Sequence, residues 1–374
     1  MHMRARWAGA LLTAAVGTVV IGPLTASTTG GGQVMSGTIW AANRGTLPAT
    51  ADTIRAFDTL TGQVLHEVHM NAGSMPGDLA VAKGKVYVAE ERGGSPAVAI
   101  VDGRTGEIVG RIFTGADSRP HHVHASAGGN LVAVGLFGTD DVAVIDTRDD
   151  TIVGRWDSNP DHESGRIHAA VFSNDESTMY LANEAGGQVI AMDPRTGTVY
   201  WRLAVPAVHE LAVAHNQKLL YATRRAANWL AVVHLDPDVW VKPATYTDAL
   251  QIGLPDTLQL SANEELLTIG LRTSPARLGV VDTRVLATCS AGGCDAAVSY
   301  ADLCPAGATA SLCASNVPNT VGGHQWTAPS GRYTWASFEG PVAGVVLIDH
   351  TDGNRVVKSL TYPGQPHGVD HSHR

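Results

Sequence analysis

The chain has 374 residues, of which 44% are apolar and 16% charged, and glycine is abundant at 41 residues. This composition is typical of a folded, turn-rich, mostly β protein and excludes a disordered or coiled-coil chain. The formal net charge is −9, and no block of lysine and arginine is present. Nucleic-acid binding is therefore not expected, because it needs a basic surface that displaces counterions.

The first 30 residues have the pattern of a secretory signal peptide followed by a spacer. Arg4 and Arg6 form a positive segment, residues 8–22 form an apolar stretch, and small residues around Ala26 offer a cleavage site. The alternative is an uncleaved membrane anchor, but the stretch is short for a span of roughly 20 residues. We expect a secreted, extracytoplasmic protein that has no membrane span in its mature form and is a monomer.

Three consecutive segments, residues 75–115, 119–156 and 166–203, are copies of one pattern. Each copy begins with a short strand, as in "RPHHVHA", and continues through a polar turn into a second strand that ends in small residues. A third strand ending in aspartate, a turn such as "RTG" and a fourth strand complete the copy. Four short antiparallel strands in roughly 40 to 45 residues predict one blade of a β-propeller.

Looser copies begin near His209, Pro255 and Gly322. The two ends of the propeller segment are incomplete in complementary ways. Residues 37–69 supply a second, third and fourth strand, whereas "GQPHGVDHSHR" at the C-terminus supplies only a first strand. Joined, they make a seventh blade and remove the exposed sheet edge. The sequence therefore predicts an all-β fold: one seven-bladed β-propeller domain over residues 37–374, closed by N- and C-terminal strands that share a blade.

All four cysteines fall within one window, where the spacing of blade starts is unusually long. We expect this Cys-rich segment, at about residues 286–318, to be a loop insertion pinned by disulfides, as is common in exported proteins. Three pairings are possible, and a structural zinc site is the alternative, although the spacings lack the two-residue knuckle of most zinc modules. The cysteines are Cys289, Cys294, Cys304 and Cys313.

The repeats resemble the YVTN-type, YncE-like β-propeller family. The resemblance is carried by "YVAEE", "YLANE", "VAVIDT", "VAIVDGRTG" and "VLIDHTDG", and it covers nearly everything from Gly37 onward apart from the cysteine window. It implies the propeller fold and leaves the activity open, because relatives of this group include binding proteins, lactonase-like hydrolases, a lyase and copper- or haem-dependent redox enzymes. The function must therefore be argued from the site.

Histidines recur at the starts of the blades. In a propeller the first strand of each blade lies innermost, so these positions converge on one end of the central channel. The second strand of each blade ends at the same mouth, which adds acidic and basic residues such as Glu184, Arg225 and Glu339. The predicted ring of imidazoles, which could bind copper or zinc, consists of His121, His168, His209, His324 and His367.

We expect His121, His122, Glu184 and Glu339 to be catalytic. If a metal is bound, His122 and His124 are expected as outer contacts or alternative ligands, and Glu184 or Glu339 would orient the rings. The main functional prediction is a copper-dependent enzyme that acts on a small molecule by oxidation or lyase chemistry, with zinc as the other metal considered. One alternative is a propeller without enzymatic activity that binds a ligand or protein. The other is a metal-free, lactonase-like hydrolase, for which a histidine–carboxylate pair would suffice.

Overall fold

The computed structural model describes residues 36–44, 52–93, 95–158, 166–236, 238, 242, 245–273, 275–288, 294–303, 322–338, 344–362 and 364–372. All of them belong to one compact unit. The signal peptide and spacer predicted over residues 1–30 lie outside the described residues.

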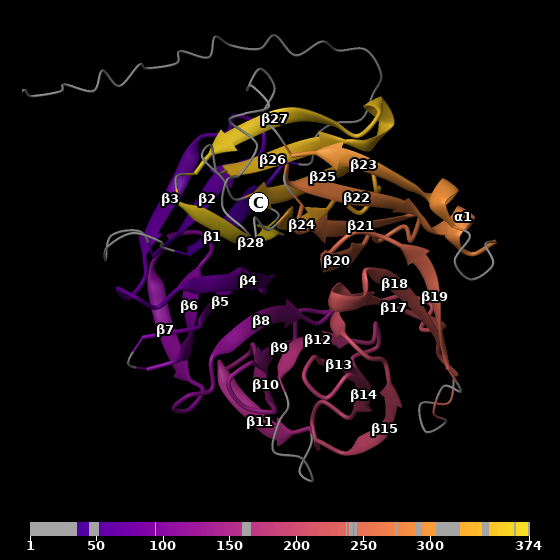
Figure 1. Cartoon of the computed structure of the whole chain (residues 1–374). Coiled ribbons are helices and arrows are strands. Elements are labelled where there is room, and N and C mark those ends of the chain that lie inside the picture. Colours follow the sequence, from indigo (N-terminus) through magenta and orange to yellow (C-terminus); the bar gives the residue numbers. More distant parts are fainter. Residues whose placement is uncertain are drawn as a thin grey trace, which may run out of the picture. The chain divides into compact units, whose positions relative to one another are not determined.

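The described residues form seven four-stranded sheets, which follow one another around a circle in chain order (Figure 1). We call them blades I to VII. Blade I consists of β4 (Pro76–Ala82), β5 (Lys85–Glu90), β6 (Ala97–Asp102) and β7 (Ile108–Phe113). Blade II consists of β8 (Pro120–Ala125), β9 (Leu131–Leu136), β10 (Asp141–Asp146) and β11 (Thr151–Asp157). Blade III consists of β12 (Ile167–Phe172), β13 (Met179–Asn183), β14 (Gln188–Met192) and β15 (Val199–Ala204).

Blade IV consists of β16 (Val208–Val213), β17 (Leu219–Arg224), β18 (Trp229–His234) and β19 (Tyr246–Gln251). Blade V consists of β20 (Pro255–Leu260), β21 (Leu266–Leu271), β22 (Arg277–Asp282) and β23 (Val298–Asp302). Blade VI consists of β24 (Gly322–Thr327), β25 (Tyr333–Phe338), β26 (Gly344–Asp349) and β27 (Arg355–Thr361). The helical turns are η1 (Arg225–Ala227), α1 (Thr283–Leu286), η2 (Asp295–Ala297) and η3 (His350–Asp352).

Blade VII closes the ring with strands from both ends of the propeller. Its order is β28 (Gln365–Ser372), β1 (Thr38–Arg44), β2 (Thr53–Asp58) and β3 (Val64–His69). Strands β28 and β1 pair antiparallel, with Val369 opposite Ala41 and Ser372 opposite Thr38. The prediction of an all-β, seven-bladed propeller with one blade shared by the N- and C-terminal strands is therefore confirmed.

The apolar core lies between the blades. Seven clusters of buried apolar side chains occur, and each draws its members from two neighbouring sheets. Trp40 of blade VII, for example, is fully buried in a cluster that also contains Val86 and Val88 of blade I. Because each sheet buries its two faces against its neighbours, every blade is stabilised by the adjacent blades.

The aspartate at the end of the third strand of several blades has a clear local function. The carboxylate Oδ1 of Asp58 accepts hydrogen bonds from the backbone N–H groups of Leu60 at 2.9 Å and Thr61 at 2.6 Å. Gly62 then takes a left-handed conformation with φ of 78°, which glycine adopts without steric cost. The same turn recurs at Asp102 with Gly106 and at Asp193 with Gly197. This turn explains the repeated "D-x-x-T-G" letters as a sharp connection between the outer strands.

Part of the cysteine window forms regular secondary structure. It contains η2 and also β23, which is the fourth strand of blade V. Cys294 is buried within a core cluster between blades IV and V. The other three cysteines lie outside the described residues, so the disulfide pairing stays a prediction.

Within the described part of the chain, no helix has the length and apolar character that a bilayer crossing requires.

The interface between strands β28 and β4 is packed so closely that it leaves no room for a methyl group at Gly368. A Cβ atom added at Gly368 would lie 2.5 Å from Asp78 Oδ1 and 2.7 Å from Asp78 Cα. We expect Gly368→Ala to lower the free energy of unfolding by about 1–3 kcal/mol, because the backbone of the next blade would have to move. Thermal or urea unfolding measures this change. Gly253→Ala is the control, because a Cβ there meets nothing within 4 Å; equal stability of the two variants would contradict the prediction.

Candidate functional site at the channel mouth

A β-bulge at the start of each innermost strand positions the polar residues of the channel. In six blades two consecutive residues of the first strand lie opposite a single residue of the second strand, and in blade III one residue, His168, is unpaired. In β8, Pro120 pairs with Leu136 and Val123 pairs with Val134, so His121 and His122 form the bulge. A bulge interrupts the alternation of side chains and re-aims them, which allows both residues to face the channel.

The bulges produce two sets of side chains. We call the first residues of the bulges the mouth ring, represented by His121, His209, Asp256 and His367. We call the second residues the inner ring. A cavity of about 340 Å³ has all the polar side chains of the inner ring in its wall, namely Asp78, His122, Glu210, Thr257 and His324.

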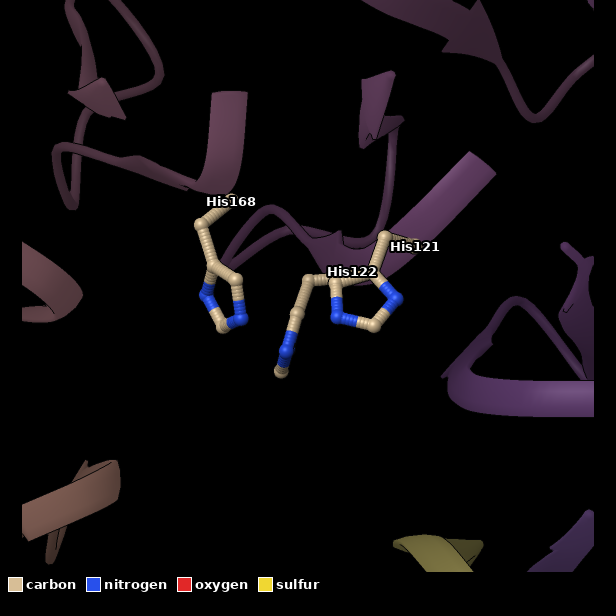
Figure 2. Close-up of side chains that lie close together, drawn as sticks. All are labelled: His121, His122 and His168. Carbon is tan, nitrogen blue, oxygen red and sulfur yellow. The ribbon is translucent and has the colours of Figure 1, made fainter. Parts of the chain in front are cut away.

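The predicted histidines do converge. Figure 2 shows His121, His122 and His168 reaching into the same space from β8 and β12. The ring centroids of His122 and His168 lie 4.2 Å apart, and those of His168 and His209 lie 3.5 Å apart. On the other side, His324 lies 4.7 Å from His122 and 4.0 Å from His367. Six imidazoles from five blades thus form a continuous packed group, as the predicted radial symmetry requires.

Burial keeps several of these imidazoles neutral. It lowers the pKa of His121 to about 3, although the hydrogen bond to Glu91 acts in the opposite direction. Burial also lowers the pKa of His168 and of His367 well below the usual value, and neighbouring positive groups add to this effect. These three side chains are therefore uncharged at physiological pH.

A dense ion cluster, which we call the Asp256 cluster, lies at one side of the mouth across blades III, IV and V. Asp256 Oδ1 accepts hydrogen bonds from Arg272 Nε at 2.9 Å and Arg225 at 3.1 Å, and lies 2.8 Å from His209 Nε2. Arg225 also donates to Glu184 Oε1 at 2.6 Å, and the same oxygen lies 3.3 Å from His209 Nδ1. His209 is thus enclosed by two carboxylates and a guanidinium group.

The charges of the Asp256 cluster shift the pKa values of its members. Burial alone would raise the pKa of Glu184, but the hydrogen bond from His209 and the positive charges of His209 and Arg225 lower it. Burial alone would lower the pKa of His209, but the hydrogen bonds to Asp256 and Glu184 raise it. Glu184 is therefore ionised at physiological pH, and its second oxygen has no hydrogen-bond partner among the described residues.

A second cluster, the Glu91 cluster, lies at the mouth beside blades VII, I and II. Glu91 Oε2 is 3.3 Å from Arg44 and 3.3 Å from His121 Nδ1, and its other oxygen pairs with Arg119. Burial alone would raise the pKa of Glu91, but these positive and hydrogen-bonding neighbours hold it well below the usual range. Next to this cluster, the guanidinium groups of Arg119 and Arg166 each lie 5.2 Å from the ring of Phe137.

The sequence identified part of this site and missed part of it. Five of the predicted residues lie at or near the mouth, whereas His122 and His324 belong to the inner ring; the five are His121, His168, His209, His367 and Glu184. Glu339 lies outside the described residues. The residues not predicted as site residues are Asp78, Glu91, Glu210, Arg225 and Asp256. Arg225 was expected at the mouth without an assigned role. A signal was available for three others, because Asp256 occupies the same place in its blade as His121, and Asp78 and Glu210 occupy the same place as His122.

Comparison with known proteins supports the propeller fold. A family model described as "Lactonase, 7-bladed beta-propeller" matches residues 114–276, which is less than half of the chain. This segment contains the whole Asp256 cluster. No curated protein matches the sequence.

Several solved structures have the same fold. One described as a 6-phosphogluconolactonase of Bacteroides fragilis is 13% identical with a TM-score of 0.65, covering 90% of this chain and 98% of that one. The periplasmic gluconolactonase PpgL of Pseudomonas aeruginosa is 16% identical with a TM-score of 0.63, covering 90% and 99%. A Lactobacillus plantarum protein is 12% identical with a TM-score of 0.66, covering 91% and 100%. At such low identity these likenesses establish the fold alone.

The comparisons correct the main functional prediction. The expected copper-dependent oxidation or lyase chemistry is wrong, because the family model that matches is a lactonase model and structural neighbours are described as gluconolactonases. The contacts at the mouth give a physical reason. Both ring nitrogens of His209 face carboxylates, and Arg225 lies 2.9 Å from its Nε2, which places a fixed positive charge where a metal ion would have to bind. The alternative of a lactonase-like hydrolase fits better.

The Asp256 cluster should depend on its central carboxylate. Asp256→Asn would leave Arg225, Arg272 and His209 together without their shared counter-charge. We expect a loss of about 3–5 kcal/mol in the free energy of unfolding, measured by urea titration, because breaking a buried ion pair leaves uncompensated charge. Asp302→Asn is the matched control, since the Asp302–Arg277 pair is largely exposed and such pairs contribute about 0–1 kcal/mol. A loss at Asp256 no larger than that of the control would show that the cluster is not coupled.

Proposed function

We propose that this protein is a metal-independent, lactonase-like hydrolase that opens a small anionic lactone at the channel mouth. The observation that carries the proposal is the Asp256 cluster, in which an ionised carboxylate, an imidazole and two guanidinium groups meet in one concave site. The lactonase family match over the segment that contains this cluster supports the same assignment.

Glu184 is the group that we assign to proton transfer. Its Oε1 accepts contacts from Arg225 and His209, whereas Oε2 remains available to a water molecule. The neighbouring cations keep the carboxylate ionised, which is the form that accepts a proton. His209 holds the carboxylate in place and is itself fixed by Asp256 on its other nitrogen.

Arg272 is the group that we assign to the lactone carbonyl. Its Nε donates to Asp256, but its terminal nitrogens have no ion-pair or hydrogen-bond partner among the described residues, and the side chain is 28% exposed. A guanidinium group at the mouth can donate hydrogen bonds to the carbonyl oxygen and stabilise the negative charge that develops there.

The reaction balances with water as the only co-reactant. A water molecule gives its proton to Glu184 as its oxygen bonds to the carbonyl carbon. The bond between that carbon and the ring oxygen then breaks. Glu184 returns the proton to the ring oxygen, which becomes the hydroxyl group of an open-chain hydroxy acid, and the acid ionises to solvent.

The mouth is positively charged, which favours an anionic substrate. Among the described residues, five guanidinium groups face three carboxylates there: Arg44, Arg119, Arg166, Arg225 and Arg272 against Glu91, Glu184 and Asp256. Arg166 is exposed and has no carboxylate partner among these residues. A phosphate or carboxylate on the substrate could pair with it, and the phosphorylated sugar lactone named for one structural neighbour has such a group.

We also propose that the blades are of the YVTN type. The support is the second strands, with "YVA" in blade I and "YLA" in blade III, and the aspartate-capped turns after the third strands of the same two blades.

Glu184→Gln should abolish hydrolysis and leave the fold intact. We expect kcat for 6-phosphogluconolactone or gluconolactone to fall by about 10²–10⁴, because an amide cannot accept the proton of water. A pH-indicator assay of acid release measures turnover. Glu107→Gln, in an exposed outer turn, is the control and should keep full activity. Failure of the wild-type protein to hydrolyse any lactone of this class would reject the proposed function and favour the alternative of a non-enzymatic binding propeller.

Arg166→Ala should weaken binding of an anionic lactone without changing the chemical step. We expect KM for the phosphorylated lactone to rise about tenfold or more with kcat nearly unchanged, since a contact remote from the reacting bond is equal in ground and transition states. The unphosphorylated lactone should be unaffected. Arg195→Ala, at an exposed turn of blade III, is the control. Equal effects on both lactones would contradict a role for Arg166 in anion binding.

A further inference from the structure

The inner ring holds a second group of polar side chains that the mouth chemistry does not use. Asp78, His122 and Glu210 are at most 5% exposed, and together with His124 and His324 they line the 340 Å³ cavity. They come from blades I, II, IV and VI, so only the closed ring brings them together. This cavity lies on the inner-ring side of the bulges, whereas Glu184, Arg225 and Arg272 lie at the mouth.

Carboxylates and imidazoles alternate within this group. Asp78 Oδ2 lies 3.4 Å from His122 Nδ1, and Asp78 Oδ1 lies 3.1 Å from His324 Nδ1. Glu210 Oε2 lies 3.3 Å from His122 Nδ1, and its Oε1 lies 3.4 Å from His124 Nε2. No lysine or arginine ion pair is recorded for Asp78 or Glu210 among the described residues.

Three buried polar atoms of this group make no hydrogen bond within the described part of the chain. Glu210 Oε2, His124 Nε2 and His324 Nε2 are inaccessible to solvent and accept or donate no hydrogen bond there. Glu210 is 2% exposed and lines the cavity. Two carboxylates and unsatisfied polar atoms in a buried space are costly unless a cation compensates them.

We propose that Asp78, His122 and His124 bind a divalent zinc-class cation inside the channel. One ligand atom from each of these residues lies within 4.8 Å of the others. Zinc holds nitrogen and oxygen ligands at 2.0–2.2 Å, which places ligand atoms about 3.3 Å apart, so the widest pair must close by at most about 1.5 Å. Glu210 contacts both histidines and is suited to orient their rings.

The ligand chemistry selects among cations. Imidazole nitrogens suit zinc and its neighbours in the first transition series, whereas calcium and magnesium prefer sites built from oxygen. The site differs in residues and position from the ring of five histidines expected from the sequence. It combines the carboxylate of Asp78 in β4 with two histidines of the single strand β8. It goes beyond the proposed hydrolase function and does not depend on it.

Zinc titration of the full chain, purified without a polyhistidine tag and stripped with a chelator, tests the site. Competition against a chromogenic chelator should show one equivalent of Zn²⁺ bound by the wild-type protein. Asp78→Asn and His122→Ala should each weaken binding by more than about 100-fold, which exceeds the 10–100-fold effect of an outer contact. His69→Ala, with a side chain 71% exposed on blade VII, should bind as the wild type does.

A second readout covers variants that fold poorly. Zn²⁺ should raise the Tm of the wild-type protein, since a ligand that binds the native state stabilises it. The His124 side chain is 29% exposed, so the His124→Ala variant should still fold. This variant should show no increase in Tm when Zn²⁺ is added. Glu184→Gln should keep full zinc binding, which separates this site from the hydrolase site. A wild-type protein that takes up no Zn²⁺ would overturn the proposal, and so would Asp78→Asn and His124→Ala variants that bind like His69→Ala.

Discussion

Every blade of this protein buries its apolar faces against two neighbours, and this mutual burial holds both the ring and its functional site together. The seven core clusters all lie between sheets, so a blade cannot be removed without exposing two of them. The ring must therefore close, and pairing of β28 with β1 closes it. Closure is also what makes a site possible, because residues more than 200 positions apart, such as Asp78 and His324, meet only across the channel.

The bulges convert this scaffold into two chemically different layers. A regular strand would direct one of two adjacent residues into the channel and the next into the sheet interface. The bulge after Pro120 allows both His121 and His122 to face the channel, and the same device operates at Asp78 and Glu210. The mouth therefore holds guanidinium–carboxylate clusters that suit an anionic substrate, while the inner layer holds carboxylates and imidazoles that suit a cation.

The distribution of arginine separates the two layers. At the mouth, Arg225 and Arg272 neutralise Glu184 and Asp256 and leave donors for a substrate. In the inner layer, the ion-pair partners of Asp78 and Glu210 among the described residues are all imidazoles. The same residue type thus serves different purposes: His209 is fixed between carboxylates beside a guanidinium group, whereas His122 lies between carboxylates without one. Counting histidines without their neighbours was what led to the incorrect prediction of copper chemistry.

The seven-bladed fold, the shared blade and the convergence of five histidines could be predicted from the amino-acid sequence; these histidines are His121, His168, His209, His324 and His367. This was possible because these features follow from strand patterning and from the position of each residue in a repeated unit, which are local properties. The sequence did not determine the partners of those histidines. The enclosure of His209 by Glu184 and Asp256, and the inward turn of Asp78 and Glu210, depend on bulges and on contacts between blades. These features became visible only in the folded protein. A bulge changes the side of the strand to which a side chain points, but it leaves no distinctive pattern in the sequence. Contacts between blades join positions that are far apart in the chain and that no local pattern relates.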